Sequence, residues 1–410
     1  MNFIRLKIIF ISCVIICATF GCNQSTGKEN TNRAETNLIV DVNKQLALSE
    51  HQLKLLANDA TTAGKIPRTV NPDGTTHWTG ENYDWTEGFF PGTCWLMYKY
   101  TGDAAWKEVA QNLQENFVDH RFHSDHDLGF IFQNSYGHGL KLTENKEFAS
   151  IMVDAGNTLI DRYDPEVGCI QSWNVASGWT SKRGWEFPVI IDNMMNLELL
   201  FELTLLTGNE KYREVAINHA NTTLKNHYRA DNSSYHVIDY DKTTGEIRNK
   251  ETAQGYSHES AWARGQAWGL YGFTLCYRYT KDTTYLNQAI RIAEFILNHP
   301  SIEEDMVPYW DYMAPKQPNE PRDASAAAIT ASALIELSEF ADPAYLTQAK
   351  RILSSLSSDK YFAEIGENNH FLLKHSTGSI PHNAEIDVPI VYADYYYIEA
   401  LMRLKEKKDI

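Results

Sequence analysis

The chain is poor in cysteine, and its cysteines are badly placed for cross-links or metal binding. Six occur among 410 residues, and three of them fall within the first 22 residues. The other three, Cys94, Cys169 and Cys276, lie far apart and form no C-x-x-C pair. An odd, scattered set argues against a disulfide framework. We therefore expect these three to be small, buried hydrophobic side chains.

Basic charge is also scarce. Lys and Arg together number 37 against 53 Asp and Glu, which gives a formal net charge of −16. No Lys- or Arg-rich run is present, so the chain lacks the basic surface that a nucleic-acid partner needs. The acidic balance does not exclude a small anionic ligand, because a few local cations in a cleft are enough to hold one.

Several familiar catalytic signatures are missing. The sequence contains no P-loop, no G-x-G-x-x-G and no G-x-S-x-G. Its histidines are scattered, and the H-E-S stretch at 258 lacks the second histidine of H-E-x-x-H. We therefore predict no metal site and no cofactor.

The amino terminus reads as a targeting segment. Arg5 and Lys7 precede a 13-residue apolar run, "IIFISCVIICATF", which is too short to cross a bilayer comfortably. Gly21 and Cys22 follow, as in a bacterial lipoprotein cleavage site with Cys22 as the lipidated residue. Ordinary signal cleavage nearby is the alternative. We expect a signal peptide at 1–22, a polar tether at 23–40, one domain at 41–410, and an exported, periplasmic, lipid-anchored protein.

A loose helical repeat runs through the rest of the chain. Similar units begin near residues 101, 143, 207, 280 and 342, each with a Thr/Asp/Gly-type turn suited to helix capping. Each then shows apolar residues at helical spacing, and a further helix precedes most of them. The units are too irregular for a regular solenoid. They fit a closed α/α toroid better, with few strands, one of them a hairpin in "SSYHVIDYDKTTGEIRNK".

Two aspartates stand in unusual surroundings. Asp192 interrupts the apolar run "FPVIIDNMMNLELL", which has an inner-helix pattern, and Asp127 lies in "SDHDLGF" before a glycine. Burying an unpaired carboxylate costs several kcal/mol or raises its pKa until it stays protonated. A protonated carboxyl at working pH can serve as a general acid. We predict a catalytic pair, with a helix cap as the alternative role of Asp127.

Aromatic residues gather near polar ones. All ten tryptophans fall between Trp78 and Trp310, several in turn-like segments such as "YDWTEGFFPG" and "ASGWTSKRGWEF". Such positions suit indoles that stack on sugar rings, although ordinary core packing is the alternative. The segment "QGYSHESAWARGQAWGLYG" places Arg264 between Trp262 and Trp268, where a cation suited to a carboxylate would lie beside a stacking surface. A solvated helical face is the alternative.

Five segments, "WTEGFFPGTCW", "DHDLGF", "FPVIIDNMMNLELL", "QGYSHESAWARGQAWGLYG" and "VYADYYYIEALMRL", together resemble the unsaturated glucuronyl hydrolases of glycoside hydrolase family 88. The resemblance covers about 45–405. It implies an all-α (α/α)6 barrel, a toroid of six hairpins, without a metal cofactor. It also implies a small oligosaccharide substrate, made by an upstream polysaccharide lyase, with a 4,5-unsaturated uronic acid at the non-reducing end.

The resemblance also implies roles for individual residues. Asp192 matches the general acid/base and Asp127 the second essential aspartate. The ring-binding and positioning set is matched by Trp85, His236, Gln254, Trp262, Arg264 and Trp268. The segment "LLKHSTGSIPHNAE" lies where the next sugar and any sulfate would be contacted, through Lys374, Ser376 and Ser379. Arg264, Gln254 and His236 all remain candidates for binding the uronate carboxylate.

The mechanism implied by the resemblance is hydration of the C4=C5 vinyl ether, with Asp192 protonating C4 and water attacking C5. Glycosaminoglycan and ulvan fragments both fit as parent glycans. Two alternatives remain. One is an unsaturated rhamnogalacturonyl hydrolase with similar fold and chemistry. The other is a non-catalytic, helical-repeat glycan-binding lipoprotein, which explains the leader and the tryptophans but not an aspartate in an apolar run.

Overall fold

The computed structural model describes residues 40–408. Residues 1–39 lie outside the described range. They include the predicted signal peptide 1–22, with Cys22, and all but the last residue of the predicted tether 23–40, so both stay predictions. Within the described range, no helix combines the length and hydropathy that a bilayer crossing demands.

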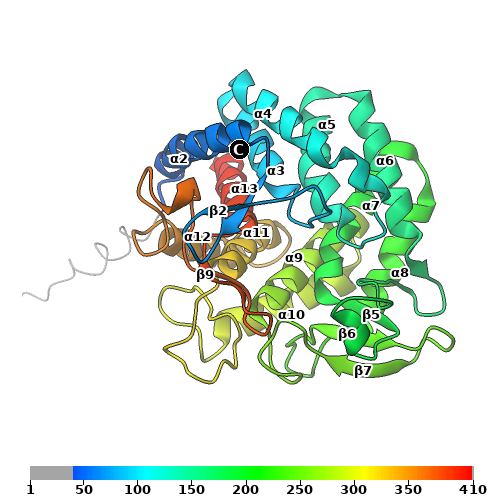
Figure 1. The fold of residues 1–410 in the computed structure, drawn as a ribbon. Helices are drawn as coiled ribbons and strands as arrows, with labels where there is room; N and C mark the ends of the chain where they lie inside the picture. Colours follow the sequence, from blue (N-terminus) through cyan, green and yellow to red (C-terminus); the bar gives the residue numbers. More distant parts are fainter. Residues whose placement is uncertain (1–39, 409–410) are drawn as a thin grey trace, which may run out of the picture. The chain divides into compact units, whose positions relative to one another are not determined.

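The helices form two concentric rings (Figure 1). Neighbours in the inner ring contact one another in chain order, and its last helix packs on its first, which closes the ring. The inner ring consists of α3 (Phe89–Thr101), η3 (Gly129–Gly137) with α5 (His138–Thr143), η5 (Ile191–Asn196) with α7 (Leu197–Thr207), α9 (Ala263–Thr280), α11 (Ala324–Phe340) and α13 (Val391–Lys408). The outer ring consists of α4 (Ala104–Gln114) with η2 (Glu115–Phe122), α6 (Lys146–Ile160), α8 (Glu210–Asn226), α10 (Thr283–Asn298), α12 (Ala344–Leu356) and α2 (Val42–Ala63). The predicted α/α toroid of six hairpins is confirmed.

Residue size and polarity explain the two rings. Inner helix α9 is buried at every position from Ala263 to Cys276, and glycines let other elements approach it closely. A Cβ added at Gly272 would lie 2.5 Å from the Cβ of Met194. Outer helix α10 instead buries one stripe at helical spacing, as expected for a helix with one face in water.

The predicted capping turns are confirmed, and four of them share one geometry. The second residue of each turn has a left-handed φ that ends the inner helix, and the third accepts a backbone N–H of the outer helix through its side chain. The left-handed residues are Gly102, Glu144, Gly208 and Lys281. The capping residues are Asp103, Asn145, Asn209 and Asp282.

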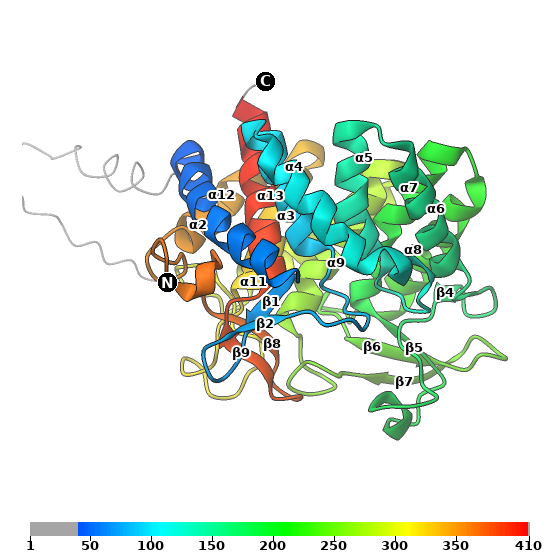
Figure 2. The same cartoon turned by 45° about the horizontal axis from the view of Figure 1, so that its top comes forward.

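Small antiparallel sheets accompany the helices, most of them at one end of the rings (Figure 2). Three of the sheets are two-stranded: β1 (Pro67–Val70) with β2 (Thr76–Trp78), β3 (Tyr163–Asp164) with β4 (Cys169–Ile170), and β8 (Ser376–Ser379) with β9 (Ala384–Val388). The fourth is three-stranded and contains, in this order, β5 (Phe187–Ile190), β6 (Val237–Tyr240) and β7 (Ile247–Glu251). The β6–β7 pair confirms the predicted hairpin. Short 3-10 turns are η4 (Thr180–Lys182) and η6 (Asn368–His370).

The segment around Asp192 differs from the predicted inner helix. Its first part, Phe187–Ile190, is the edge strand β5, and a 3-10 turn, Ile191–Asn196, separates that strand from α7. Pro188 and the β-branched Val189 and Ile190 suit an edge strand better than a helix. Asp192 therefore lies in the first turn after a strand, at the end of the inner ring where the sheets gather.

The three cysteines of the described chain match their predicted role. Cys94, Cys169 and Cys276 are free thiols, and all three are buried. Burial raises the pKa of each thiol above its ordinary value. They therefore pack as small apolar side chains rather than as reactive thiolates.

Candidate active site

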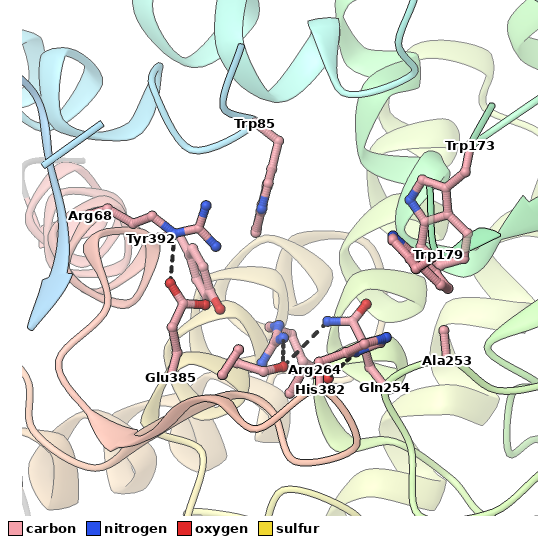
Figure 3. Close-up of a pocket in the computed structure, with 13 residues that line it drawn as sticks. Arg68, Trp85, Trp173, Trp179, Ala253, Gln254, Arg264, His382, Glu385 and Tyr392 are labelled. Carbon is pink, nitrogen blue, oxygen red and sulfur yellow. Dashed lines mark hydrogen bonds and ion pairs between the residues drawn. The ribbon is translucent and has the colours of Figure 1, made fainter. Parts of the chain in front are cut away.

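Two adjoining cavities open where the loops and sheets gather, and four residues, Trp85, Trp173, Gln254 and Arg264, line both. The inner cavity has a volume of about 100 Å³ and is also lined by Asp127, Phe130, Ile190 and Asp192. The outer cavity, of about 270 Å³ (Figure 3), is also lined by Arg68, Trp179, Ala253, Gly378, Ser379, His382, Ala384, Glu385 and Tyr392. The structure thus brings the two predicted aspartates into one chamber, with a roomier chamber outside it.

Asp192 is the more isolated of the two carboxyls. It is 9% exposed, and its Oδ2 has no hydrogen-bond partner among the described residues. Burial raises the pKa of Asp192 to about 6, although the nearby charges of Arg264 and His126 act in the opposite direction. A carboxyl in this state carries a proton in mildly acidic solution, and the residue lines the inner cavity, as a general acid requires.

Asp127 lies in a denser electrostatic environment. Burial, together with the neighbouring charges of Asp125 and Asp192, raises its pKa to about 7, although His126 acts in the opposite direction. The backbone carbonyl of Asp127 accepts from Ile131 N at 3.1 Å, at the start of the π-helix η3. The charge of Asp192 thus raises the pKa of Asp127, and the predicted effect of Asp127 on the pKa of Asp192 stays a prediction.

Asn196, which sequence reasoning missed, joins the two aspartate-bearing segments. Its Nδ2 donates to Oδ1 of Asp127 at 3.3 Å, and its Oδ1 accepts from Phe130 N at 2.9 Å. Gly129 makes this contact possible, because a Cβ there would lie 2.4 Å from the Cα of Asn196. One amide therefore fixes the start of η3 against the end of η5, which carries Asp192.

His236 faces Asp192 in a defined tautomer. Its Nδ1 accepts backbone N–H groups of Ala253 at 3.1 Å and Gln254 at 3.2 Å, so the ring proton must lie on Nε2. That Nε2 is 3.6 Å from Oδ2 of Asp192, beyond hydrogen-bond distance. Burial and the charge of Arg264 hold the pKa of His236 well below its usual value. The ring is therefore a neutral donor directed at the Asp192 carboxyl.

Arg264 holds the wall of the site. Its Nη1 donates to Oδ2 of Asp323 at 2.9 Å and to the carbonyl oxygen of Thr377, and its Nη2 donates to the carbonyl oxygen of Gly378 at 2.6 Å. These bonds fix strand β8 beside the cavity, as Figure 3 shows in part. Gln254 Nε2 donates to the same Gly378 carbonyl at 3.3 Å. Both residues line the cavities as predicted, but Asp323 already neutralises the guanidinium.

The structure divides the predicted tryptophans into two groups. Trp85 lines both cavities. Trp262 and Trp268 line neither, which corrects the expected stacking surface around Arg264. Trp268 is 0% exposed, with its ring centroid 5.0 Å from that of Phe130, and Trp262 is packed against the His236 ring at 4.7 Å. Their positions just before and within α9 place them behind the cavity wall, where they support the residues that face the cavity.

Of the three residues predicted to meet the next sugar, only Ser379 reaches a cavity. Its Oγ is hydrogen-bonded to Nδ1 of His382 at 2.7 Å. Ser376 is buried in β8 and Lys374 donates to the carbonyl oxygen of Asp359 at 2.6 Å, so neither lines either chamber. The hairpin therefore presents its turn end, rather than its first residues, to the outer cavity.

Several cavity residues were not predicted individually: Arg68, Trp173, Trp179, His382, Glu385 and Tyr392. Trp179 lies in a segment whose tryptophan content did indicate a sugar site. Arg68 joins distant parts of the wall, because it donates to Asp84 and to Glu385, each at 2.7 Å. Figure 3 shows Arg68 and Glu385 at one side of the outer cavity and Trp173 and Trp179 at the other.

Asp125, His126 and Asp127 are the one group of three metal-type side chains, within residues 40–408, whose ligand atoms lie within 4.8 Å of one another. Each ring nitrogen of His126 faces its own carboxylate oxygen directly, at 3.2 Å for Asp125 and 3.3 Å for Asp127. This is the geometry of two ion pairs rather than of ligands that converge on an ion. The absence of a metal cofactor stays a prediction from the sequence.

Comparison with known proteins agrees with this geometry. A family model described as Glycosyl Hydrolase Family 88 matches residues 62–407. An unsaturated glucuronyl hydrolase from Formosa agariphila is 43% identical over 366 residues, 88% of this chain and 90% of that protein. An unsaturated chondroitin disaccharide hydrolase from Streptococcus agalactiae is 33% identical, over 79% of this chain and 82% of that protein. The crystal structure of an unsaturated glucuronyl hydrolase specific for heparin superposes with a TM-score of 0.85 at 44% identity, covering 90% of this chain and 98% of that one. The match over most of the chain, together with the paired carboxyls in an α/α toroid, shows that this protein belongs to glycoside hydrolase family 88.

Proposed function

We propose that this enzyme removes a 4,5-unsaturated glucuronyl residue from the non-reducing end of oligosaccharides that a polysaccharide lyase has produced. The observation that carries the proposal is the Asp192 carboxyl. It is 9% exposed and lines the inner cavity, its Oδ2 has no partner among the described residues, and its pKa is raised to about 6. Such a group is suited to give a proton to carbon in a substrate bound beside it.

The reaction follows from the double bond of the substrate. Asp192 gives its proton to C4, which leaves an oxocarbenium-like centre at C5 next to the ring oxygen. Water attacks C5 and returns a proton to the Asp192 carboxylate, so that one water is added across C4=C5. The resulting hemiketal opens by breaking its bond from C5 to the ring oxygen, and the hemiacetal left at C1 expels the aglycone. This scheme needs one acid/base carboxyl rather than the nucleophile and acid of an ordinary retaining glycosidase.

The other residues of the site have supporting parts. The neutral Nε2–H of His236, 3.6 Å from Asp192 Oδ2, can donate to the carboxylate that remains after proton transfer. Asp127 accepts from the ring hydroxyls and adds to the negative charge that holds the proton on Asp192. Trp85 and Trp173, which line both chambers, offer aromatic faces to the unsaturated ring and to the next sugar.

For the parent glycan we propose glycosaminoglycan fragments, with ulvan fragments as the alternative. Relatives that carry chondroitin disaccharide or heparin in their names support the first. The test is loss of the unsaturated-uronate absorbance when the enzyme meets lyase digests of chondroitin, heparin, hyaluronan and ulvan. Turnover of any digest supports the reaction, and the preferred digest names the glycan. Binding without loss of absorbance would leave a glycan-binding protein instead.

We propose further that the enzyme is exported and tethered to a membrane through a lipid on Cys22, in the periplasm. The 13-residue apolar run followed by Gly21 and Cys22 supports this. Mass spectrometry of the amino terminus of the mature protein tests it. Acylated Cys22 as the first residue is the expected result, and an unmodified terminus elsewhere would indicate ordinary signal cleavage.

A further inference from the structure

His126 lies between the two carboxylates of Asp125 and Asp127. Its Nδ1 is 3.2 Å from Oδ1 of Asp125, and its Nε2 is 3.3 Å from Oδ1 of Asp127. The side chain is 1% exposed, and neither ring nitrogen has any other partner among the described residues. Its ring meets Trp173, which lines both cavities, edge to face at 6.4 Å. The imidazole thus lies just behind the inner chamber, next to Asp127.

When both carboxyls are ionised, this geometry suits only the protonated ring. A neutral imidazole has one N–H and one lone pair, so it would direct a lone pair at a carboxylate oxygen on one side. In a site closed to water that repulsion is not screened. An imidazolium instead offers an N–H to each carboxylate, and the two opposite charges compensate for the burial of its own.

We infer that His126 is a positioning residue that stays an imidazolium between Asp125 and Asp127, and that its positive charge makes both Asp127 and Asp192 give up a proton more readily. The inference rests on the proposed function, because it concerns the two carboxyls that the hydration reaction uses. His126 touches no substrate and acts through the state and orientation of Asp127.

The surrounding charges agree with this assignment. The charges of Asp127 and Asp125 raise the pKa of His126, against burial and the nearby charge of Arg162. Burial would raise the pKa of Asp125, but His126 and a hydrogen bond to it hold that pKa at about 2. Tyr83 Oη also donates to Asp125 at 3.1 Å.

Neither Arg162 nor His219 donates a hydrogen bond to Asp125 or Asp127, although the charge of Arg162 acts on His126 and Asp125 from nearby. Arg162 uses its donors on Gln171, Ser124, Asn174 and Ser172 rather than on Asp125. Burial lowers the pKa of His219 to about 3, which keeps that ring neutral. The charge of His126 lowers the pKa of both Asp127 and Asp192, so its removal must move both upward.

The first experiment follows activity against pH for His126→Asn and His126→Gln, beside the wild type. An opposite charge within hydrogen-bonding range typically shifts a carboxyl pKa by about 1–3 units. We therefore expect both limbs of the kcat/KM profile to move to higher pH by about one unit or more. A merely structural role would lower activity at every pH and leave the limbs in place, and that result would overturn the inference. His138→Asn is the control. His138 is half-buried, is bonded to Tyr395 at 2.8 Å and lines neither active-site cavity, so the limbs of this variant should not move.

The second experiment needs neither a variant that folds nor turnover. Nitrogen-15 NMR of histidine-labelled wild-type enzyme reports the protonation of each ring. His126 is assigned through its contact with Trp173, and His236, which also contacts Trp173 at 5.8 Å, is told apart by its further contact with Trp262. We expect both ring nitrogens of His126 to keep their protons about one unit or more above the ordinary histidine pKa of about 6.5. A neutral ring at pH 6 would refute the inference. Loss of turnover on all unsaturated uronates, with an imidazolium still seen, would instead refute the proposed function.

Discussion

Nε2 of His236 lies 3.6 Å from Oδ2 of Asp192, and two backbone N–H groups hold the ring in the tautomer that puts its proton on Nε2. The gap is too long for a hydrogen bond to the protonated acid, and it can close once Asp192 becomes a carboxylate. A hydrogen bond to a charged group contributes about 1.5–3 kcal/mol. Replacement His236→Ala should therefore lower kcat by about 10–150-fold, measured at saturating substrate. An unchanged kcat with a raised KM would show that His236 binds the substrate without assisting the acid.

Asp192→Asn should abolish turnover while the fold persists. The amide is nearly isosteric with the carboxyl but cannot give a proton to C4. General acid/base groups typically contribute about 10²–10⁴-fold, so the residual rate should fall by that factor. The rate is followed by loss of the unsaturated-uronate absorbance, and circular dichroism with a thermal melt checks the fold. A folded variant that keeps more than about a tenth of the wild-type rate would show that another group is the acid.

The pH dependence of kcat/KM should follow the raised pKa of Asp192. Burial raises that pKa to about 6, and the reaction needs the protonated form. Activity should therefore be lost as the pH rises through about 6.

In Asp127→Asn a like charge is removed, so Asp192 should release its proton more readily. The alkaline limb of the kcat/KM profile should then move to lower pH, together with a severe loss of rate. An alkaline limb that stays in place would leave Asp127 with a purely positional role.

Gly129→Ala should damage the site through the backbone. The added Cβ would lie 2.4 Å from the Cα of Asn196, and no side-chain rotation relieves that contact. The segments that carry Asp127 and Asp192 must then move apart, so we expect both a lower melting temperature and a large loss of activity. Gly80→Ala is the matched control, because the nearest atom to its Cβ is 4.0 Å away. Equal behaviour of the two variants would contradict the close packing of η3 on η5.

Local chemistry made much of this structure predictable. The capping turns depend on neighbours in sequence, so the turns near residues 101 and 207 could be predicted, and the structure identifies their capping residues as Asp103 and Asn209. The buried acid was visible because Asp192 stands among apolar residues. The links that depend on ring closure could not be foreseen: Asn196 bonds Phe130 across 66 positions, and Arg68 bonds Glu385 across 317.

Orientation was the other limit of the sequence. The aromatic segment around Arg264 suggested that Trp262 and Trp268 face a sugar, but composition does not say which side of a wall a side chain takes. In the inner ring of a toroid both sides are buried, one against the outer helices and one toward the site. Trp268 packs against Phe130 on the side away from the cavity, and the tryptophans that line the cavity, Trp173 and Trp179, come from a loop instead.

The position of solvent oxygen in the product tests hydration of the double bond most directly. The reaction is run in ¹⁸O water with a lyase-derived disaccharide, and the released uronate product is analysed by mass spectrometry and NMR. Hydration predicts the label at C5 and no new bond between C1 and solvent oxygen in the enzymatic step. It also predicts one deuterium at C4 when D₂O is the solvent, and no cleavage of saturated glucuronides. Label at C1, or cleavage of a saturated glucuronide at a comparable rate, would contradict the account and indicate direct displacement at the anomeric carbon.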